Sequence, residues 1–174
     1  LLGEIALSRS GEPLALPASR KTRALFVYLL LCAKPVRRER LCEIFFDIPD
    51  DPRAALRWSL SKIRTMLGEQ ADLISADRER VSIDSSGFTV DVDHMDATLA
   101  LENALPGMDL PGLDEYALWL ASERAAIDRK RARRLDEAAR NSRNPDADRN
   151  RFAAAAEALG DGAAQTSQPS TNQT

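Results

Sequence analysis

Apolar side chains recur at helical spacing between residues 51 and 68, in the stretch DPRAALRWSLSKIRTMLG. Wound at about 3.6 residues per turn, four of them share one stripe: Leu56, Leu60, Ile63 and Leu67. Asp51 suits the N-cap, Pro52 suits the first turn, and Gly68 suits the position after the last turn. The pattern predicts a helix over residues 52–67 that packs its apolar stripe on a core.

Two further helices are expected before this one. Residues 20–33 are apolar nearly all round after the first turn, which is typical of a buried helix, and Ser19 is a suitable N-cap. Residues 38–46 form a second amphipathic pattern, whose inner face holds Leu41, Ile44 and Phe45. Residues 47–52 are rich in Asp and Pro, so we expect a turn there.

Short strands are expected on both sides of the helices. Ser10-Gly11 is a turn signal between residues 4–8 and 13–16, which predicts a small N-terminal antiparallel pair. The strands expected after the third helix are residues 73–76, 81–83 and 89–92, the first two joined by a charged tip at residues 77–80.

The remaining chain is mostly helical in pattern. The expected segments are a short helix at 97–105, a long helix at 114–140, a polar linker at 141–150, a further helix at 151–159 and a disordered tail at 165–174. Within the long helix, residues 128–134 are rich in Arg and Lys. We interpret this run as solvated surface, with a second patch for DNA or an acidic partner as the alternative.

This order of elements defines the expected fold class. Two strands, three helices and a hairpin make an α+β domain with the layout of a winged helix-turn-helix: a small N-terminal sheet, a C-terminal hairpin wing, and then an all-α segment. In such a fold one helix enters the major groove while the hairpin touches the backbone nearby. A three-helix core with a hairpin also occurs in interaction modules that bind no DNA, so both functions stay open.

The polar side of residues 52–67 carries the candidate chemistry. Arg53, Arg57, Ser61 and Arg64 fall together on one flank of the helix, and Trp58, Lys62 and Thr65 lie further round. Guanidinium and hydroxyl groups read guanine edges and hold phosphates. A solvated helix surface is the plain alternative for these charges, and packing against a neighbouring element is our interpretation of Trp58.

The charge distribution favours a local basic surface. The 174-residue chain has a net charge of −3, which by itself disfavours a nucleic-acid partner. Residues 1–70, however, hold 12 Lys and Arg against 8 Asp and Glu, while residues 71–100 hold 2 against 7. A basic block followed by an acidic one indicates a local electrostatic footprint, which decides binding more than the overall sum.

Nothing in the sequence predicts an enzyme, a cofactor or a metal site. His94 is the single histidine, Cys32 and Cys42 match no metal or redox spacing, and no glycine-rich phosphate loop or nucleophile elbow occurs. We interpret the cysteines as buried reduced thiols, which favours a cytoplasmic protein. The apolar run at residues 24–33 is too short to cross a bilayer, so we expect no membrane role.

Several stretches resemble the SARP family of bacterial transcriptional activators. They are SRKTRAL at 19–25, PVRRERL at 35–41, LSKIRTMLG at 60–68, VSID at 81–84, VDVD at 90–93, LPG at 105–107 and WLASER at 119–124. The resemblance follows the family's order over roughly residues 1–140. The C-terminal half is shorter than the family's helical domain.

The resemblance implies three parts and a function. Residues 1–93 would form an OmpR-type winged-helix DNA-binding domain, residues 94–140 the start of a TPR-like bacterial transcriptional activation domain, and residues 141–174 a linker, a short helix and a tail. It implies an activator in the bacterial cytoplasm, associated with the nucleoid, that binds double-stranded promoter DNA in tandem or as a homodimer and recruits RNA polymerase. The DNA-binding residues implied are Arg57, Ser61 and Arg64 on the recognition helix, Arg53 and Lys62 at phosphates, and Arg78 and Arg80 at the wing tip.

A second hypothesis of another class remains. The acidic block and the negative net charge also suit a winged-helix and helical module that regulates a larger signalling protein through protein contacts, without binding DNA. The two hypotheses differ in one geometric expectation. DNA binding needs Arg53, Arg57, Arg64 and the tip at residues 77–80 on one continuous positive face, uninterrupted by carboxylates.

Overall fold

The helix expected over residues 52–67 is α3 (Pro52–Leu67) in the computed structural model, which describes residues 1–32, 34–46 and 51–165. Asp51 is its N-cap, with a carboxylate oxygen accepting from the Ala54 N–H at 2.8 Å. All four residues of the apolar stripe are buried. Gly68 follows the last turn with φ 56°, a left-handed conformation that glycine adopts without a steric cost.

The two preceding helices also form where periodicity placed them. They are α1 (Arg20–Cys32) and α2 (Arg38–Phe46). The Ser19 hydroxyl accepts from the Thr22 N–H at 3.3 Å, which confirms the N-cap, and the inner face of α2 is buried as expected. The expected extension of α1 to position 33 and residues 47–50 of the expected turn lie outside the described residues.

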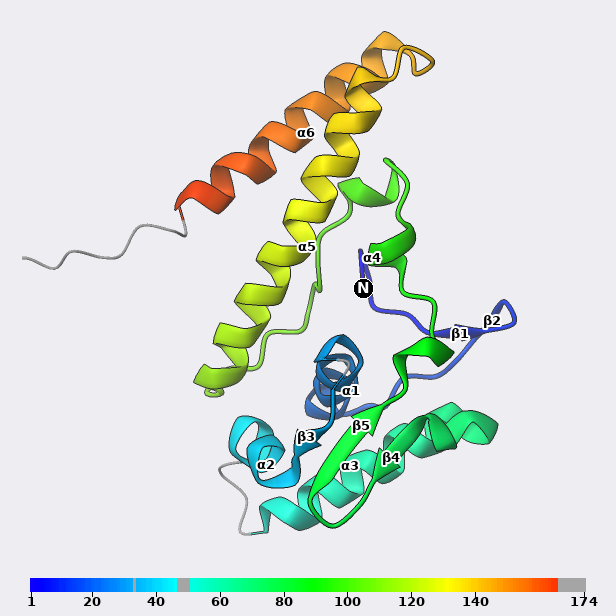
Figure 1. The fold of residues 1–174 in the computed structure, drawn as a ribbon, viewed down its shortest axis with the longest axis vertical. Helices are drawn as coiled ribbons and strands as arrows, with labels where there is room; N and C mark the ends of the chain where they lie inside the picture. The colour runs from blue at the N-terminus through cyan, green and yellow to red at the C-terminus, as the bar shows by residue number, and fades with distance from the viewer. Residues whose placement is uncertain (33, 47–50, 166–174) are drawn as a thin grey trace, which may run out of the picture. The chain divides into compact units, whose positions relative to one another are not determined.

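A three-stranded antiparallel sheet lies beside these helices (Figure 1). It consists of β3 (Val36–Arg37), β5 (Arg80–Ile83) and β4 (Ile74–Ala76), in that order, with Val36 opposite Val81 and Ile74 opposite Ile83. The hairpin β4–β5 confirms the expected pair of strands. The third strand comes from the segment between α1 and α2, which the sequence pattern did not indicate.

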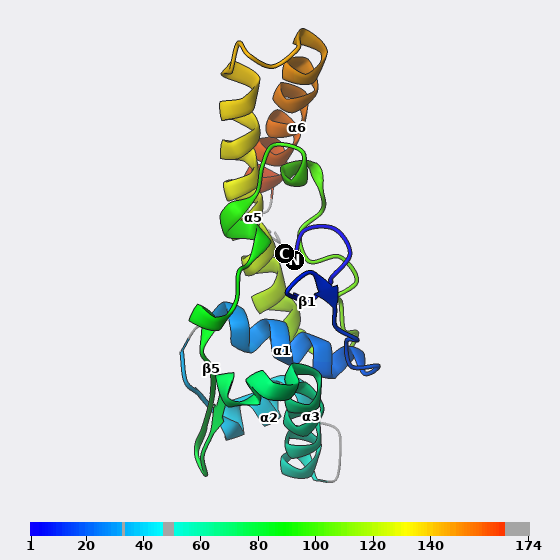
Figure 2. The same cartoon turned by 90° about the vertical axis from the view of Figure 1, so that its right-hand side faces the viewer.

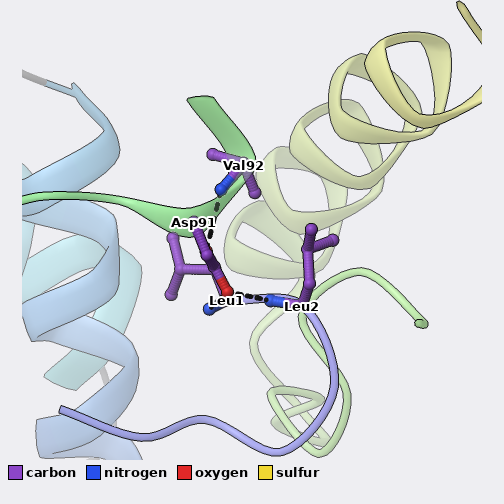
Figure 3. A network of polar contacts seen from close by, with 4 residues as sticks. All are labelled: Leu1, Leu2, Asp91 and Val92. Carbon is purple, nitrogen blue, oxygen red and sulfur yellow. Dashed lines mark hydrogen bonds and ion pairs between the residues drawn. The ribbon is translucent and has the colours of Figure 1, made fainter. Parts of the chain in front are cut away.

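The strand expected at residues 89–92 is wrong, because part of this segment is the short helix α4 (Asp91–His94). The Asp91 carboxylate accepts from the Val92 N–H at 2.9 Å and from the Leu2 N–H at 2.9 Å, and the Leu1 amino group lies 2.7 Å from it (Figure 3). The Asp91 carboxylate thus binds the N–H of its neighbour Val92, which a strand would need for its ladder, and also the N–H of Leu2.

The N-terminal strand pair forms but is shorter than expected. The strands are β1 (Ser8–Arg9) and β2 (Glu12–Pro13), joined through Ser10 and Gly11, both at positive φ. This conformation matches the twist of a tight hairpin. The pairing extends by one hydrogen bond beyond the strands, from the Leu14 N–H to the Leu7 carbonyl at 2.8 Å, and Leu2 forms an antiparallel bridge with Ala104.

Contacts divide the chain into two compact units. The helix–hairpin unit comprises Ala6–Thr89 and Met108–Leu120, and the helical unit comprises Leu1–Ile5, Val90–Gly107 and the chain from Ala121 onward. The helix α5 (Asp114–Arg140) contributes its first residues to the former and the rest to the latter. Three short 3₁₀ segments complete the described structure, at Gly68–Leu73, Ser85–Gly87 and Leu99–Leu101.

The core of the helix–hairpin unit joins α1, α2, α3 and the start of α5. Between α1 and α3 the buried Thr22 hydroxyl donates to the Ser59 hydroxyl at 3.1 Å. An aromatic cluster joins α1, α2 and the start of α5, with ring centroids 4.7 Å apart for Tyr28 and Trp119 and 5.2 Å apart for Phe45 and Tyr116. Such tilted aromatic pairs stabilise beyond the area they bury, so the start of α5 is part of this core.

In the helical unit, α5 and α6 (Asp146–Gln165) run antiparallel to each other (Figures 1 and 2). The expected helix at 114–140 is confirmed, and the helix expected at 151–159 is longer, taking in half of the expected linker. The helix expected at 97–105 is wrong: only a 3₁₀ turn forms, and the positive φ of Leu105 is incompatible with a helix. Most of the tail lies outside the described residues.

The charged run at residues 128–134 is not all solvated surface. Arg131 is 5% exposed, donates from Nε to the Ala100 carbonyl at 3.0 Å and from Nη2 to the Leu101 carbonyl at 3.4 Å, and forms an ion pair with Asp128. The expectation of a solvated run is therefore wrong for Arg131, which ties α5 to the 3₁₀ turn at Leu99–Leu101.

Among the described residues, no helix combines the length and apolar character needed to cross a bilayer.

The cap of α3 gives a first prediction. Replacing Asp51 by alanine removes the acceptor for the Ala54 N–H, so the free energy of unfolding of the helix–hairpin unit should fall by about 1 kcal/mol. Urea unfolding followed by circular dichroism measures this loss. Asp51→Asn keeps an acceptor oxygen at the same position and should retain most of the stability; an equal loss in both variants would contradict the capping role.

Candidate nucleic-acid interface

A groove of about 940 Å³ lies between α2, α3 and the tip of the β4–β5 hairpin, entirely within the helix–hairpin unit. Six arginines line it: Arg37, Arg38, Arg53, Arg57, Arg78 and Arg80. Three carboxylates line it as well: Glu39, Asp77 and Glu79. We call this feature the arginine groove. Its lining residues carry a formal excess of three positive charges, in a chain whose net charge is −3.

Arginines from β3, from β5 and from the start of α2 meet at the arginine groove, through strand pairing and hydrogen bonds. Arg37 on β3 is the register partner of Arg80 on β5. Arg38 is bound at the tip twice, because its backbone N–H donates to the Glu79 carbonyl at 2.7 Å and its Nε donates to the Asp77 carbonyl at 2.6 Å. The start of α2 therefore holds the hairpin tip in position opposite α3.

The first two turns of α3 supply the other wall. Arg53 and Arg57 are one helical turn apart and both are exposed. Arg53 lies 3.3 Å from Glu39, with both side chains at least 70% exposed, so this ion pair is weak and leaves the guanidinium accessible. No ion pair of Arg57 is present among the described residues.

Three carboxylates interrupt the continuous positive face that DNA binding was expected to need, although the arginines of the groove outnumber them two to one. Asp77 accepts from the backbone N–H groups of Glu79 and Arg80, each at 2.7 Å, and shapes the turn of the tip. These hydrogen bonds, the one from Arg80 first, lower the pKa of the Asp77 carboxyl below its ordinary value. Asp77 shapes the turn and Glu39 faces Arg53, but both keep their negative charge, so the arginine groove is a mixed surface with an excess of positive charge.

The structure brings together four of the seven residues proposed from sequence: Arg53, Arg57, Arg78 and Arg80 line the same groove. Ser61 and Lys62 are exposed on α3 but do not line it. Arg64 is only half exposed, and its Nη2 donates to the Ile74 carbonyl at 3.1 Å. Arg64 therefore fastens α3 to β4, and the continuous face expected for Arg53, Arg57, Arg64 and the tip does not include it.

Sequence reasoning missed two lining residues and misjudged a third position. Arg37 and Arg38 were not assigned to a site, although the run VRRER carried the signal of consecutive basic residues before a helix. Trp58 was expected to pack against a neighbouring element; instead it is 52% exposed, with the Lys62 Nζ 5.4 Å from its ring centroid. That distance is within the range of a cation–π contact.

The described part of the chain contains no cluster of three or more His, Cys, Asp or Glu side chains that could hold a metal ion. Comparison of the chain with protein-family models, with curated proteins and with solved structures returned no match. The geometry of the arginine groove and of α3 therefore carries the functional conclusion.

The turn at the tip gives a second prediction, in pH. Because the folded-state pKa of Asp77 is lowered, its contribution to the turn is present above the ordinary pKa and is lost as pH falls through the lowered value. In an NMR titration, the Glu79 and Arg80 amide shifts should move with one midpoint below the ordinary pKa of an aspartate. Asp77→Asn should abolish this titration while keeping the turn; a midpoint at or above the ordinary value would contradict these hydrogen bonds.

Proposed function

We propose that this protein is a sequence-specific DNA-binding regulator of transcription, built on a winged helix. In this proposal α3 enters the major groove, and the β4–β5 tip contacts the backbone or the minor groove beside it. The observation that carries the proposal is the arginine groove, in which arginines of α3 and arginines of the hairpin line one hollow. A duplex presents two phosphate walls and a floor of base edges to such a surface.

The arrangement of elements supports the same proposal. Three helices are followed by a hairpin whose inner strand pairs with the segment before α2, and α3 buries one stripe while exposing its polar face. Helix-turn-helix proteins present their second helix to DNA from an arrangement of this kind, which supports the proposal. The resemblance to the SARP family adds the activator role, promoter DNA in tandem or dimeric binding, recruitment of RNA polymerase and a cytoplasmic location; these belong to the proposal.

The contacts divide the site residues into two roles. Arg57 is exposed on the groove side of α3, and its planar fork matches the O6 and N7 acceptors of guanine, so it is our candidate for base recognition. Arg78, Arg80 and Arg53 are placed for phosphates, which supply affinity without sequence choice. Arg64 has a positioning role, because it holds the hairpin base against α3.

Selection from a randomised duplex pool tests the proposal. The purified chain should enrich one motif, and its affinity for that motif should fall steeply with salt, because binding releases counterions from several phosphates. Arg129, exposed on α5 in the helical unit, provides a matched control, since Arg129→Ala removes the same charge far from the arginine groove in sequence.

The two hypotheses predict different outcomes of this selection. An enriched motif whose binding survives Arg129→Ala but not a change in the arginine groove supports a DNA-reading regulator. No enrichment, with weak binding that is equally sensitive to any lost positive charge, contradicts it. The second hypothesis, a module for protein contacts, would then explain the arginine groove as a site for an acidic partner.

A further inference from the structure

The exposed face of α3 has two edges rather than one. At about 100° per residue, Arg57 and Lys62 lie roughly 140° apart around the helix axis, as do Arg53 and Trp58. The first edge, Arg53 and Arg57, lines the arginine groove. The second edge, Trp58 and Lys62, does not line that groove and is exposed to solvent.

The strip of α3 between the two edges carries short side chains. It holds Ser61 and Thr65, whose side chains are short, and the Thr65 hydroxyl donates to the Ser61 carbonyl at 3.0 Å within the helix. A helix with a low central strip and long cationic side chains on both flanks can approach a surface that has two negatively charged walls. The major groove is such a surface, about 12 Å wide and bounded by a phosphate chain on each side.

A partner that covers the exposed Trp58 ring must tolerate the positive charge of Lys62 beside it. An indole buries more apolar area than most side chains, and at 52% exposure much of this area faces solvent. The Lys62 ammonium lies 5.4 Å from the ring centroid, so any surface that covers Trp58 must also accept a positive charge. The thymine methyl group meets this condition, because it is an apolar patch in the major groove close to phosphates.

We propose that Trp58 and Lys62 form a second DNA-contacting edge of α3, with the indole packed on a thymine methyl group and the ammonium at a phosphate of the adjoining strand. This inference rests on the proposed function and adds a specificity determinant to it. It makes Trp58 a reader of A·T pairs, complementing the guanine contact assigned to Arg57. The bound site should therefore contain a thymine at a fixed distance from the guanine.

The test replaces thymines of the selected duplex, one at a time, by deoxyuridine, which pairs identically but lacks the methyl group. At one position the unsubstituted chain should lose affinity about fourfold, the value expected for one buried methyl. Trp58→Ala should bind the original duplex more weakly and should show no further loss at that position. Lys62→Ala should reduce the slope of log affinity against log salt by about one, with the deoxyuridine effect retained.

One control and two possible outcomes separate this inference from the proposed function. Titration of DNA should quench a tryptophan emission component that is missing in Trp58→Phe, while Trp119 within the aromatic cluster continues to emit. If the unsubstituted chain binds its motif and Trp58→Ala binds equally well, this inference is overturned while the proposed function stands, and Trp58 faces a protein. If the unsubstituted chain enriches no motif, both fail together.

Discussion

Replacing Arg57 by alanine should lower the affinity for the selected duplex by between about 5-fold and about 150-fold. This range corresponds to the loss of one bidentate contact to guanine, worth about 1–3 kcal/mol. The effect should be specific to sequence: the variant should discriminate less against duplexes altered at the contacted guanine, while its binding to unrelated DNA changes little. Fluorescence anisotropy with the selected duplex and with point-altered duplexes measures both quantities.

A matched pair of variants distinguishes recognition of bases from general electrostatic attraction to DNA. Arg80→Ala, at the hairpin tip, should weaken binding to all duplexes to a similar degree and reduce the salt slope by about one, because a phosphate contact carries no sequence information. Arg129→Ala should leave affinity and discrimination nearly unchanged. An equal loss of affinity for Arg57→Ala and Arg129→Ala would show that binding depends on net charge alone. This result would contradict the proposed recognition role of α3.

Replacing Arg131 by alanine should have the largest effect on stability, with a loss of about 1–3 kcal/mol in the free energy of unfolding of the helical unit. The side chain is almost fully buried and binds the Ala100 and Leu101 carbonyls and the Asp128 carboxylate. Removing it leaves a buried carbonyl without its donor and a carboxylate without its partner, which costs more than the interaction itself contributes.

The neighbouring arginine on the same helix provides the comparison. Arg129 is exposed, so Arg129→Ala should change the free energy of unfolding by no more than about 0.5 kcal/mol. Arg131→Lys keeps the charge but not the planar fork, and should fall between the two. Thermal and urea unfolding of the three variants, followed by circular dichroism, gives the ranking. Equal stability of Arg131→Ala and Arg129→Ala would contradict the anchoring role.

Local periodicity and capping were sufficient to place α1, α2 and α3. The helices α2 and α3 each have a stripe of apolar residues at helical spacing, and α1 is apolar nearly all round. Ser19 and Asp51 mark two of the starts by side-chain chemistry that acts within three residues. The hairpin β4–β5 was predicted for the same reason, since its strands and its charged tip are contiguous in sequence.

The features that the sequence did not predict depend on contacts between distant residues. The strand β3 is two residues long and owes its conformation to pairing with β5, more than 40 residues later, so Arg37 and Arg38 could not be placed at the arginine groove. Arg131 was taken for a surface residue because its partners, the backbone carbonyls near residue 100, carry no signal in the side-chain pattern. Trp58 was assigned to packing because most tryptophans are largely buried.

The aromatic cluster limits where this chain can be truncated. A fragment ending near residue 93 would keep Tyr28 and Phe45 but lose Tyr116 and Trp119, which pack against them from the start of α5. The exposed rings would form an apolar patch, and such a fragment should aggregate in expression even though every arginine of the arginine groove is present. A minimal fragment must therefore retain the chain from Met108 to Leu120.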